Sequence, residues 1–543
     1  MKVEKKKIFL VVISILIICL IFLFSNNIGH FSNDTITTNP KNSFELKNIN
    51  PKSNFYLYIL LVGLFGSYGL LIRQFFKSIC LHDLNYLPPT KEPLFKYLFL
   101  IVFAFGIFSL SIETYHAKGE SLDTFHEGDF LSPYVNLKHG SVPYKDFFFS
   151  QGYFQNIGAM KMSANLFGES ISSRKKIESL TKILAFALLG VSVIVLSWRN
   201  LTETALSSIG LLLLSYTFLI TTPRDLFVFV FIILGILTLR TNSRLNTHIY
   251  VFLSVVTVYL AFYHSVEKGL YCLASLIVLV FLKIILAEKK IEILFTALLT
   301  FSICLIVFNI ITRFSLIDIF EYIKFVNNDY SKIYGYPIDL GTREWILFLI
   351  GLGLSSFFFF SKIDLKELIQ FNLESLVLKY GINLFLFAVV LTTSISSITR
   401  GDKEHLSYAV SVSYLYVFWN SSKMLIHVSK PYFASFGKQI NMFLIIILIA
   451  ITTHRLILVF QDDLISKNFP NQNDTFFLDK DYILAKEFLR NEYLNMNKKS
   501  YPINSETIWF YLLDQPCDCR FQMAIFYQYS QNGSGVKNRS LRS

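Results

Sequence analysis

Charge is scarce in this sequence. Of its 543 residues only 16% are Asp, Glu, Lys or Arg, whereas 53% are hydrophobic and 55 are Phe, with a mean hydropathy of +0.49. A soluble domain of this length needs far more charge to cover its surface. The composition therefore excludes an ordinary soluble protein.

Several signatures are also missing. The sequence has no Gly-rich P-loop and no dinucleotide fingerprint. No A-x-A-like cleavage site follows Phe24, so the basic start MKVEKKK and the apolar block after it predict an uncleaved anchor. Four of the six cysteines lie in or beside apolar blocks, where Cys behaves as a small hydrophobe. We expect no metal site at Cys517 and Cys519 and no bound cofactor, and leave open whether a divalent ion takes part.

Long apolar runs, in contrast, are abundant. They come in blocks of roughly 17–22 residues, the length that crosses about 30 Å of hydrocarbon, and some are shorter. Their Leu, Ile, Phe and Val residues do not alternate with polar ones, which favours helices over the strands of a barrel. We therefore predict an all-α polytopic membrane protein with about 11–13 transmembrane helices. The blocks are 8–25, 55–72, 97–113, 179–197, 204–221, 226–239, 249–263, 269–286, 292–311, 344–360, 380–398, 406–420 and 440–459, of which 226–239 and 406–420 are the weakest.

Lysine and arginine predict the orientation. Counted from a cytoplasmic N-terminus, the cytoplasmic connections carry about twice as many basic residues as the short external ones, as the positive-inside rule expects. The net charge of +12 is then mostly a matter of topology, and no nucleic-acid partner is needed. We predict a multi-pass protein of the inner (cytoplasmic) membrane with an external C-terminus. An amphipathic stretch, 363–379, is expected to lie on the membrane surface.

The chain then divides into four parts. Residues 1–113 form N-terminal transmembrane helices, and 114–178 form a long external loop with the residue types of a catalytic loop. Residues 179–460 form the transmembrane core, with an external loop at 312–343 that could cover a site. Residues 461–543 are expected to be a small external α/β appendage, with a helix over 479–497, a strand or buried run over 506–516, and a disordered end.

The external loop carries the chemistry. Glu127, Asp129 and Asp146 lie among aromatic residues and glycines close to where a span leaves the membrane. We predict a short helix over 131–140 ended by Gly140, a turn at VPYKD, and a second helix over 153–168 ended by Gly168. A partly desolvated carboxylate at this place suits acid–base chemistry on a lipid head group. The alternative is that these are solvated loop carboxylates.

These residues resemble the first external loop of GT-C class glycosyltransferases, in particular the bacterial branch similar to protein O-mannosyltransferases and lipid A aminoarabinose transferases. That loop has an acidic motif, a helix, G-x-x-P-Y-x-D, then LFG followed by Arg. His126 stands where the family usually has Asp, so either Glu127 or Asp129 is the working carboxylate. The matching residues are Glu127, Gly128, Gly140, Pro143, Tyr144, Asp146, Phe167, Gly168 and Arg174.

Two further places agree in position with this resemblance. Arg400 and His405, in SITRGDKEHLSY at the mouth of a span, resemble the family's element near the lipid phosphate; otherwise they cap a helix end. Glu267 and Lys268, in HSVEKGL between two spans, are charged at a depth where charge tends to be functional, or they pair to close a turn.

The resemblance implies a glycosyltransferase that uses a polyprenyl-phosphate-linked sugar on the external face and inverts the anomeric carbon. Glu127 or Asp129 would accept the proton of a lipid, glycan or protein acceptor, and Asp146 would orient the acceptor or the loop. Arg400, His405 and Arg174 would bind the donor phosphate, with Glu267, Lys268 and Tyr144 as accessory residues. Two alternatives remain: a transporter or flippase for a lipid-linked saccharide or small solute, and an O-antigen ligase or polymerase.

Overall fold

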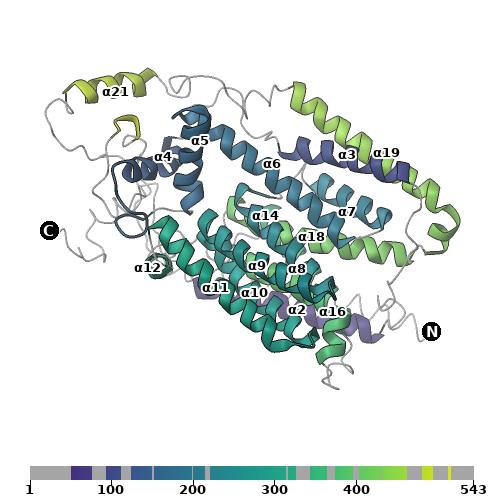
Figure 1. Cartoon of the computed structure of the whole chain (residues 1–543). Coiled ribbons are helices and arrows are strands. Elements are labelled where there is room, and N and C mark those ends of the chain that lie inside the picture. The colour runs from purple at the N-terminus through teal and green to yellow at the C-terminus, as the bar shows by residue number, and fades with distance from the viewer. Residues whose placement is uncertain are drawn as a thin grey trace.

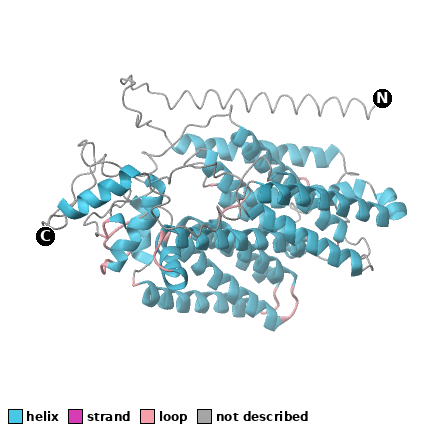
Figure 2. Cartoon of the chain, turned by 90° about the horizontal axis from the view of Figure 1, so that it is seen from above, coloured by secondary structure: helices cyan, strands magenta, loops and turns pink. Residues whose placement is uncertain are grey.

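The fold is helical throughout the part that the structure describes. The structure is a computed structural model, and it describes residues 51–75, 93–111, 124–148, 152–197, 200–214, 221–313, 316–325, 343–363, 373–395, 403–428, 430–461, 480–492 and 511–514. These residues contain no strand, only an isolated bridge between Pro143 and Phe147 (Figure 2). The expected first span, 8–25, lies outside the described residues.

The long helices follow the predicted apolar blocks closely, and short helices lie between or after them. They are α2 (Pro51–Phe75), α3 (Pro93–Ser111), α4 (Thr124–Lys138), η2 (Phe154–Gly158), α5 (Ala159–Phe167), α6 (Ile171–Leu196), α7 (Leu201–Leu214), η3 (Pro223–Asp225), α8 (Leu226–Arg240), α9 (Arg244–His264), α10 (Val266–Leu286), α11 (Lys290–Thr312), α12 (Leu316–Phe325), α14 (Arg343–Phe360), α16 (Leu373–Ser394), α18 (Lys403–Val428), α19 (Lys430–Gln461) and α21 (Lys480–Glu492).

Six described helices are long and apolar enough to cross a membrane. They lie within α6, α9, α10, α11, α16 and α19, and four shorter apolar helices fall within α2, α3, α7 and α14. The prediction of an all-α polytopic membrane protein is therefore confirmed. The two weakest blocks, 226–239 and 406–420, are helical too, in α8 and α18.

One prediction from the sequence needs correction. Residues 373–379, expected on the membrane surface, are the first turns of the spanning helix α16; residues 364–372 lie outside the described part. The sequence predicted either a strand or a buried run over 506–516. Its described part, 511–514, forms a helical turn in which Leu512 and Leu513 are buried, so this part is a buried run and not a strand. The predicted helix over 479–497 is confirmed for its described part by α21.

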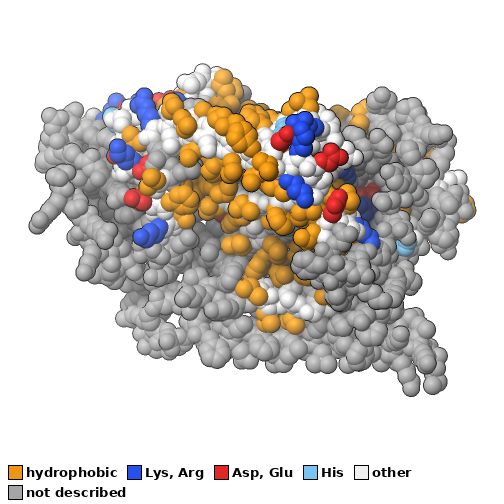
Figure 3. Space-filling model, turned by 60° about the horizontal axis from the view of Figure 1, so that its bottom comes forward, with side chains coloured by type: hydrophobic (Ala, Val, Ile, Leu, Met, Phe, Trp, Pro, Cys, Tyr) orange, Lys and Arg blue, Asp and Glu red, His pale blue; other side chains and the backbone are white. Residues whose placement is uncertain are grey.

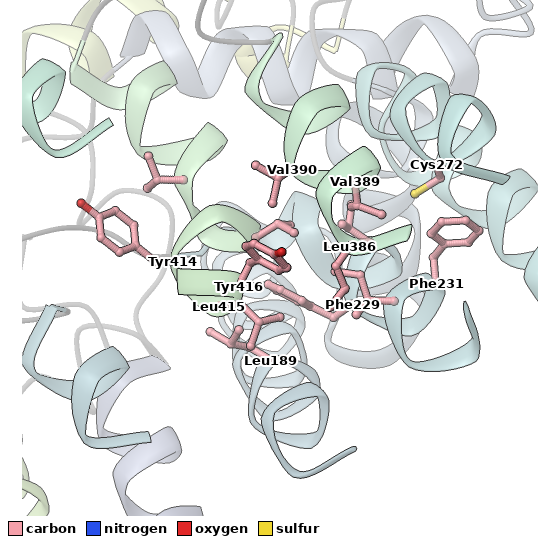
Figure 4. Close-up of a cluster of buried hydrophobic side chains, with 14 of the residues drawn as sticks. Leu189, Phe229, Phe231, Cys272, Leu386, Val389, Val390, Tyr414, Leu415 and Tyr416 are labelled. Carbon is pink, nitrogen blue, oxygen red and sulfur yellow. The ribbon is translucent and has the colours of Figure 1, made fainter. Parts of the chain in front are cut away.

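The bundle is held together by aromatic side chains that pack on glycines. A Cβ atom built on Gly235 of α8 would lie 2.2 Å from the ring of Phe385 on α16, so only glycine admits the ring there. Small residues that allow close helix approach are typical of membrane bundles, where lipid supplies no hydrophobic driving force between helices. The same buried region joins α6, α8, α10, α16 and α18, as Figure 4 shows for Leu189, Phe229, Cys272, Leu386 and Tyr416.

The long helices run between two ends of the bundle (Figure 1). The end that carries α4, α5 and α12 is called the loop end here. The other, called the opposite end, contains Arg240, Lys283, Lys362 and Lys423. A helix of 21 residues such as α10 is about 31 Å long, which matches the thickness of bilayer hydrocarbon. Four of the basic residues predicted to face the cytoplasm thus gather at the end away from the loop.

The surface between the two ends is apolar. Figure 3 shows hydrophobic side chains gathered across the middle of one face, with charged side chains toward its two sides. On α11 alone, Phe295, Leu298, Ile306 and Ile310 are between 58% and 73% exposed. Such a patch would be a liability in water, and it suits a surface covered by lipid.

Candidate functional site

The first described element of the predicted external loop is α4. Thr124–Lys138 is helical, and the chain leaves the helix through Gly140, whose φ of +94° is open to glycine at no steric cost. The predicted helix and its stop are therefore confirmed. The helix begins earlier than expected, however, so that Glu127 and Asp129 lie in its first two turns.

Because α4 starts before Glu127, both candidate carboxylates belong to the same helix, and helical geometry sets the direction of each. Positions two residues apart in an α-helix are about 200° apart around the axis. Positions 127 and 129 therefore lie on different sides of α4. Position 127 lies one turn before Phe130, on the same face of α4, whereas position 129 does not. The side chains of both residues lie outside the described part.

The second motif element is a tight turn. The Asp146 carboxylate accepts a hydrogen bond from the backbone N–H of Val142 at 2.6 Å, and the Tyr144 N–H donates to the Phe147 carbonyl at 2.8 Å. Tyr144 itself has a φ of +62°, a conformation that non-glycine residues adopt at a cost. Its ring is buried, and burial raises the pKa of its phenol well above the ordinary value. The Asp146 carboxylate thus ties the end of the turn back to its start at Val142.

The third element joins the loop to the bundle. The chain enters η2 and α5 through Gly152, whose φ is +147° and where a Cβ would lie 2.7 Å from the carbonyl oxygen of His264. Asn156 accepts a hydrogen bond from the Gly152 N–H at 3.1 Å. The predicted second helix is confirmed, and it ends at Gly168 with a φ of +89°.

Arg174 lies where α4 meets α6. Its guanidinium group stands 4.2 Å from the centre of the Phe130 ring, and its Nη2 lies 3.3 Å from a carboxylate oxygen of Glu178. The side chain is only 3% exposed, although Arg is almost never fully buried without partners. The sequence named Arg174 as a phosphate-binding residue, and the structure places it beside the face of α4 that includes position 127.

A buried ion pair lies at the same end of the bundle. Lys268 Nζ is 2.9 Å from Asp225 Oδ1, and both side chains are 1% exposed. The second Asp225 oxygen accepts from the Thr222 N–H at 3.0 Å and from the Thr221 and Thr222 hydroxyls at 3.3 Å. Lys268 was named from the sequence; Asp225 was missed, although Thr-Pro-Arg-Asp is a helix-start pattern that points to it.

Glu267 and Lys268 have different surroundings. Whereas Lys268 lies against Asp225, Glu267 accepts a hydrogen bond from the Tyr271 hydroxyl at 2.9 Å. Lys268 is therefore a buried cation with a carboxylate at contact distance.

His264 links the ion-pair region to the loop. Its ring stacks on Phe154 at 4.9 Å, meets the edge of Phe227 at 5.5 Å, and places Nε2 3.4 Å from Gln155 Nε2. Gln155 and Asn156 are buried and were not singled out from the sequence. No periodicity or motif distinguishes them, because their burial depends on how the loop packs on α9.

The remaining predicted residues are only partly placed. Arg400 lies outside the described residues, and His405 is in the first turn of α18 with its side chain outside the described part. Within the described residues, no group of three or more His, Cys, Asp or Glu could hold a metal ion.

The loop end therefore offers two carboxylate positions on α4, a buried arginine, a buried lysine–carboxylate pair and buried amides. Such a set can bind a phosphate and hydroxyl-rich groups and move a proton. Comparison with known proteins does not add to this: the chain matches no family model, no curated protein and no solved structure.

Proposed function

We propose that this protein is an integral-membrane glycosyltransferase of the GT-C type, which transfers a sugar from a polyprenyl-phosphate-linked donor to an acceptor hydroxyl. The reaction takes place at the loop end, which faces the outside of the inner membrane. The N-terminus is cytoplasmic, and the segment 461–543 lies on the same side as the loop. A contact of 3.1 Å between Lys138 Nζ and Asp514 supports this last point.

One observation carries the proposal. Three motif positions of the loop lie at one end of the bundle: position 127 on the same face of α4 as Phe130, the turn held by Asp146, and Arg174 at the start of α6, against the Phe130 ring. A carboxylate position beside a buried arginine is what a base and a leaving phosphate would need.

The chemistry follows from these roles. A carboxylate of α4 accepts the proton of the acceptor hydroxyl while the acceptor oxygen bonds to the anomeric carbon. The bond between that carbon and the phosphate oxygen breaks, and the electron pair leaves with the phosphate. Arg174, together with Arg400 and His405, neutralises the charge that develops there. Attack opposite the leaving phosphate inverts the anomeric carbon.

The position of residue 127 on the same face of α4 as Phe130, whose ring contacts Arg174, favours Glu127 as the base. Glu127→Gln should lower sugar transfer from a lipid-linked donor by about 10²–10⁴-fold, the usual cost of removing a general base. Asp129→Asn is the matched control, since it changes the same chemical group on another face of the helix, and it should lower transfer far less. The measurement is radiolabelled sugar transferred per unit of membrane protein.

These measurements distinguish the two candidate bases, and they distinguish a glycosyltransferase from a transporter. If Asp129→Asn is the severe change, the base is Asp129 and the helical argument fails. If both variants keep wild-type transfer, or if the protein moves the lipid-linked saccharide across vesicles without bond cleavage, the glycosyltransferase proposal is wrong and a transporter is favoured.

A further inference from the structure

The short helix α12 lies where α11 leaves the membrane. The span within α11 ends at Ile310, and α12 begins at Leu316, after Arg313 has turned the chain with a φ of +61°. Figure 1 shows α12 at the loop end, below the end of α11. The helix therefore lies at the boundary between hydrocarbon and head groups.

The outer side of α12 continues the apolar surface of α11. Ile310 at the end of the span is 73% exposed, and Ile317 and Phe320 on α12 are 71% and 57% exposed. The same side also carries exposed Glu321 and Lys324. A short helix with apolar and charged residues along one exposed side suits the interface of a bilayer, where the apolar residues enter the acyl region and a lysine reaches the head groups.

The inner side of α12 packs on the loop. The Tyr322 ring lies 5.4 Å from the ring of Tyr144 and 5.6 Å from that of Phe148. Tyr144 has positive φ, and such a conformation persists only when its surroundings hold it. Tyr322 is thus part of what keeps the turn of Val142–Phe147 in its shape.

We propose that α12 is an interfacial helix that binds the lipid surface through Ile317 and Phe320 and holds the Tyr144 turn through Tyr322. The outer side of α12 then contacts lipid, while its inner side contacts the turn. The occupant is the bilayer rather than a protein partner, because the exposed side of α12 continues the apolar surface of a spanning helix. This inference does not depend on the proposed reaction.

The lipid contact is tested in vesicles of phosphatidylcholine and phosphatidylglycerol. In a full-length chain without native cysteines, an environment-sensitive fluorophore is attached through Ile317→Cys, Phe320→Cys or, as the control on a different side of α12, Asp318→Cys. A phosphatidylcholine with a nitroxide near the top of its acyl chain should quench the first two several-fold more than the third. Equal quenching at all three positions, or none, would overturn the lipid contact.

Whether Tyr322 keeps the turn closed is tested by proteolysis of the protein in the same vesicles. Lys145, exposed in the turn, is cut by a lysine-specific protease only when the turn opens. Tyr322→Ala should speed cleavage after Lys145 on the order of tenfold, whereas Tyr322→Phe, which keeps the ring, should not. Cleavage after Lys161 on α5 is the internal control, because general unfolding would speed both. Unchanged cleavage in Tyr322→Ala, or equal acceleration at Lys145 and Lys161, would overturn the hold.

Discussion

The two ends of the bundle bury lysine in different ways. At the loop end, Lys268 faces the carboxylate of Asp225 at 2.9 Å. At the opposite end, Lys362 donates hydrogen bonds to the amide oxygens of Asn383 and Asn420. Lys268 thus has a carboxylate at contact distance, whereas Lys362 contacts amide oxygens and also interacts electrostatically with the buried carboxylate of Glu203.

The basic residues around Lys362 have structural partners. Arg240 donates to the carbonyls of Val195 and Leu196 at the end of α6, and Lys283 donates to Thr241 O at 2.7 Å. Cations at helix C-termini satisfy carbonyls that have no partner within the helix and complement the helix dipole. The lysines Lys362 and Lys423 also lie 5.3 and 3.8 Å from the centre of the Trp419 ring. The opposite end therefore uses cations to close helix ends and places the buried Glu203 near Lys362 and Lys423, whereas the loop end holds Lys268 and Asp225 in direct contact.

The largest effect is expected for the buried ion pair. Lys268→Met leaves the Asp225 carboxylate buried without its cation, and breaking a buried pair in this way costs about 3–5 kcal/mol. The double variant Asp225→Asn with Lys268→Met removes both charges and should recover most of the loss. Thermal unfolding of the purified proteins in one detergent measures both. Equal stability of Lys268→Met and the wild type would show that the pair is not what holds this end together.

Gly152→Ala should have the next largest effect, because it separates the loop from α9. The new Cβ would meet the His264 carbonyl oxygen at 2.7 Å in a backbone conformation with φ of +147°. Backbone strain and overpacking together should cost roughly 3 kcal/mol. Gly140→Ala is the matched control: its φ is also positive, at +94°, but its Cβ would enter open space. A loss in Gly140→Ala as large as in Gly152→Ala would mean that conformation alone, and not the approach to His264, matters.

A smaller effect is expected at the opposite end. Lys362→Met removes the donor from two buried amide oxygens and should cost about 1–3 kcal/mol, the usual penalty for unsatisfied buried polar groups. The Tyr416 hydroxyl lies 3.4 Å from the Asn383 oxygen and can still donate a hydrogen bond to it, which should reduce the loss of stability. Unfolding is followed as for Lys268→Met. If the two lysine variants lose the same stability, the distinction between the two ends fails.

Much of the fold could be predicted from the sequence, but less of the site. Apolar blocks predict helices because a backbone in lipid must satisfy its own hydrogen bonds. Gly140 and Gly168 predict helix ends because few other residues adopt positive φ. The Asp225–Lys268 contact could not be predicted, because it joins η3 to α10 across 43 positions and depends on how the helices pack. The start of α4 was also missed, since the Gly128 within it does not favour a helix.

The smallest effect is expected where the C-terminal segment meets the loop. Lys138 at the end of α4 lies 3.1 Å from Asp514 and 3.5 Å from Glu169, with 41% of its side chain exposed. Exposed pairs of this kind contribute about 0.2–1 kcal/mol, and salt weakens them. Lys138→Gln should therefore lower the free energy of unfolding by no more than this, and the difference should shrink in high salt.

The pH dependence of that difference identifies its source. The hydrogen bond to Asp514, together with the charges of Glu169 and Asp514, raises the pKa of Lys138 above its ordinary value. A lysine whose pKa is higher in the folded state stabilises the fold below its unfolded-state pKa of about 10.4. The stabilisation is lost as the pH rises through the folded-state pKa. The unfolding free energies of wild type and Lys138→Gln should thus differ by a constant amount from about pH 6 to 9 and converge above about pH 11. A difference that persists at the highest pH would instead assign the effect to lost packing of the lysine stem.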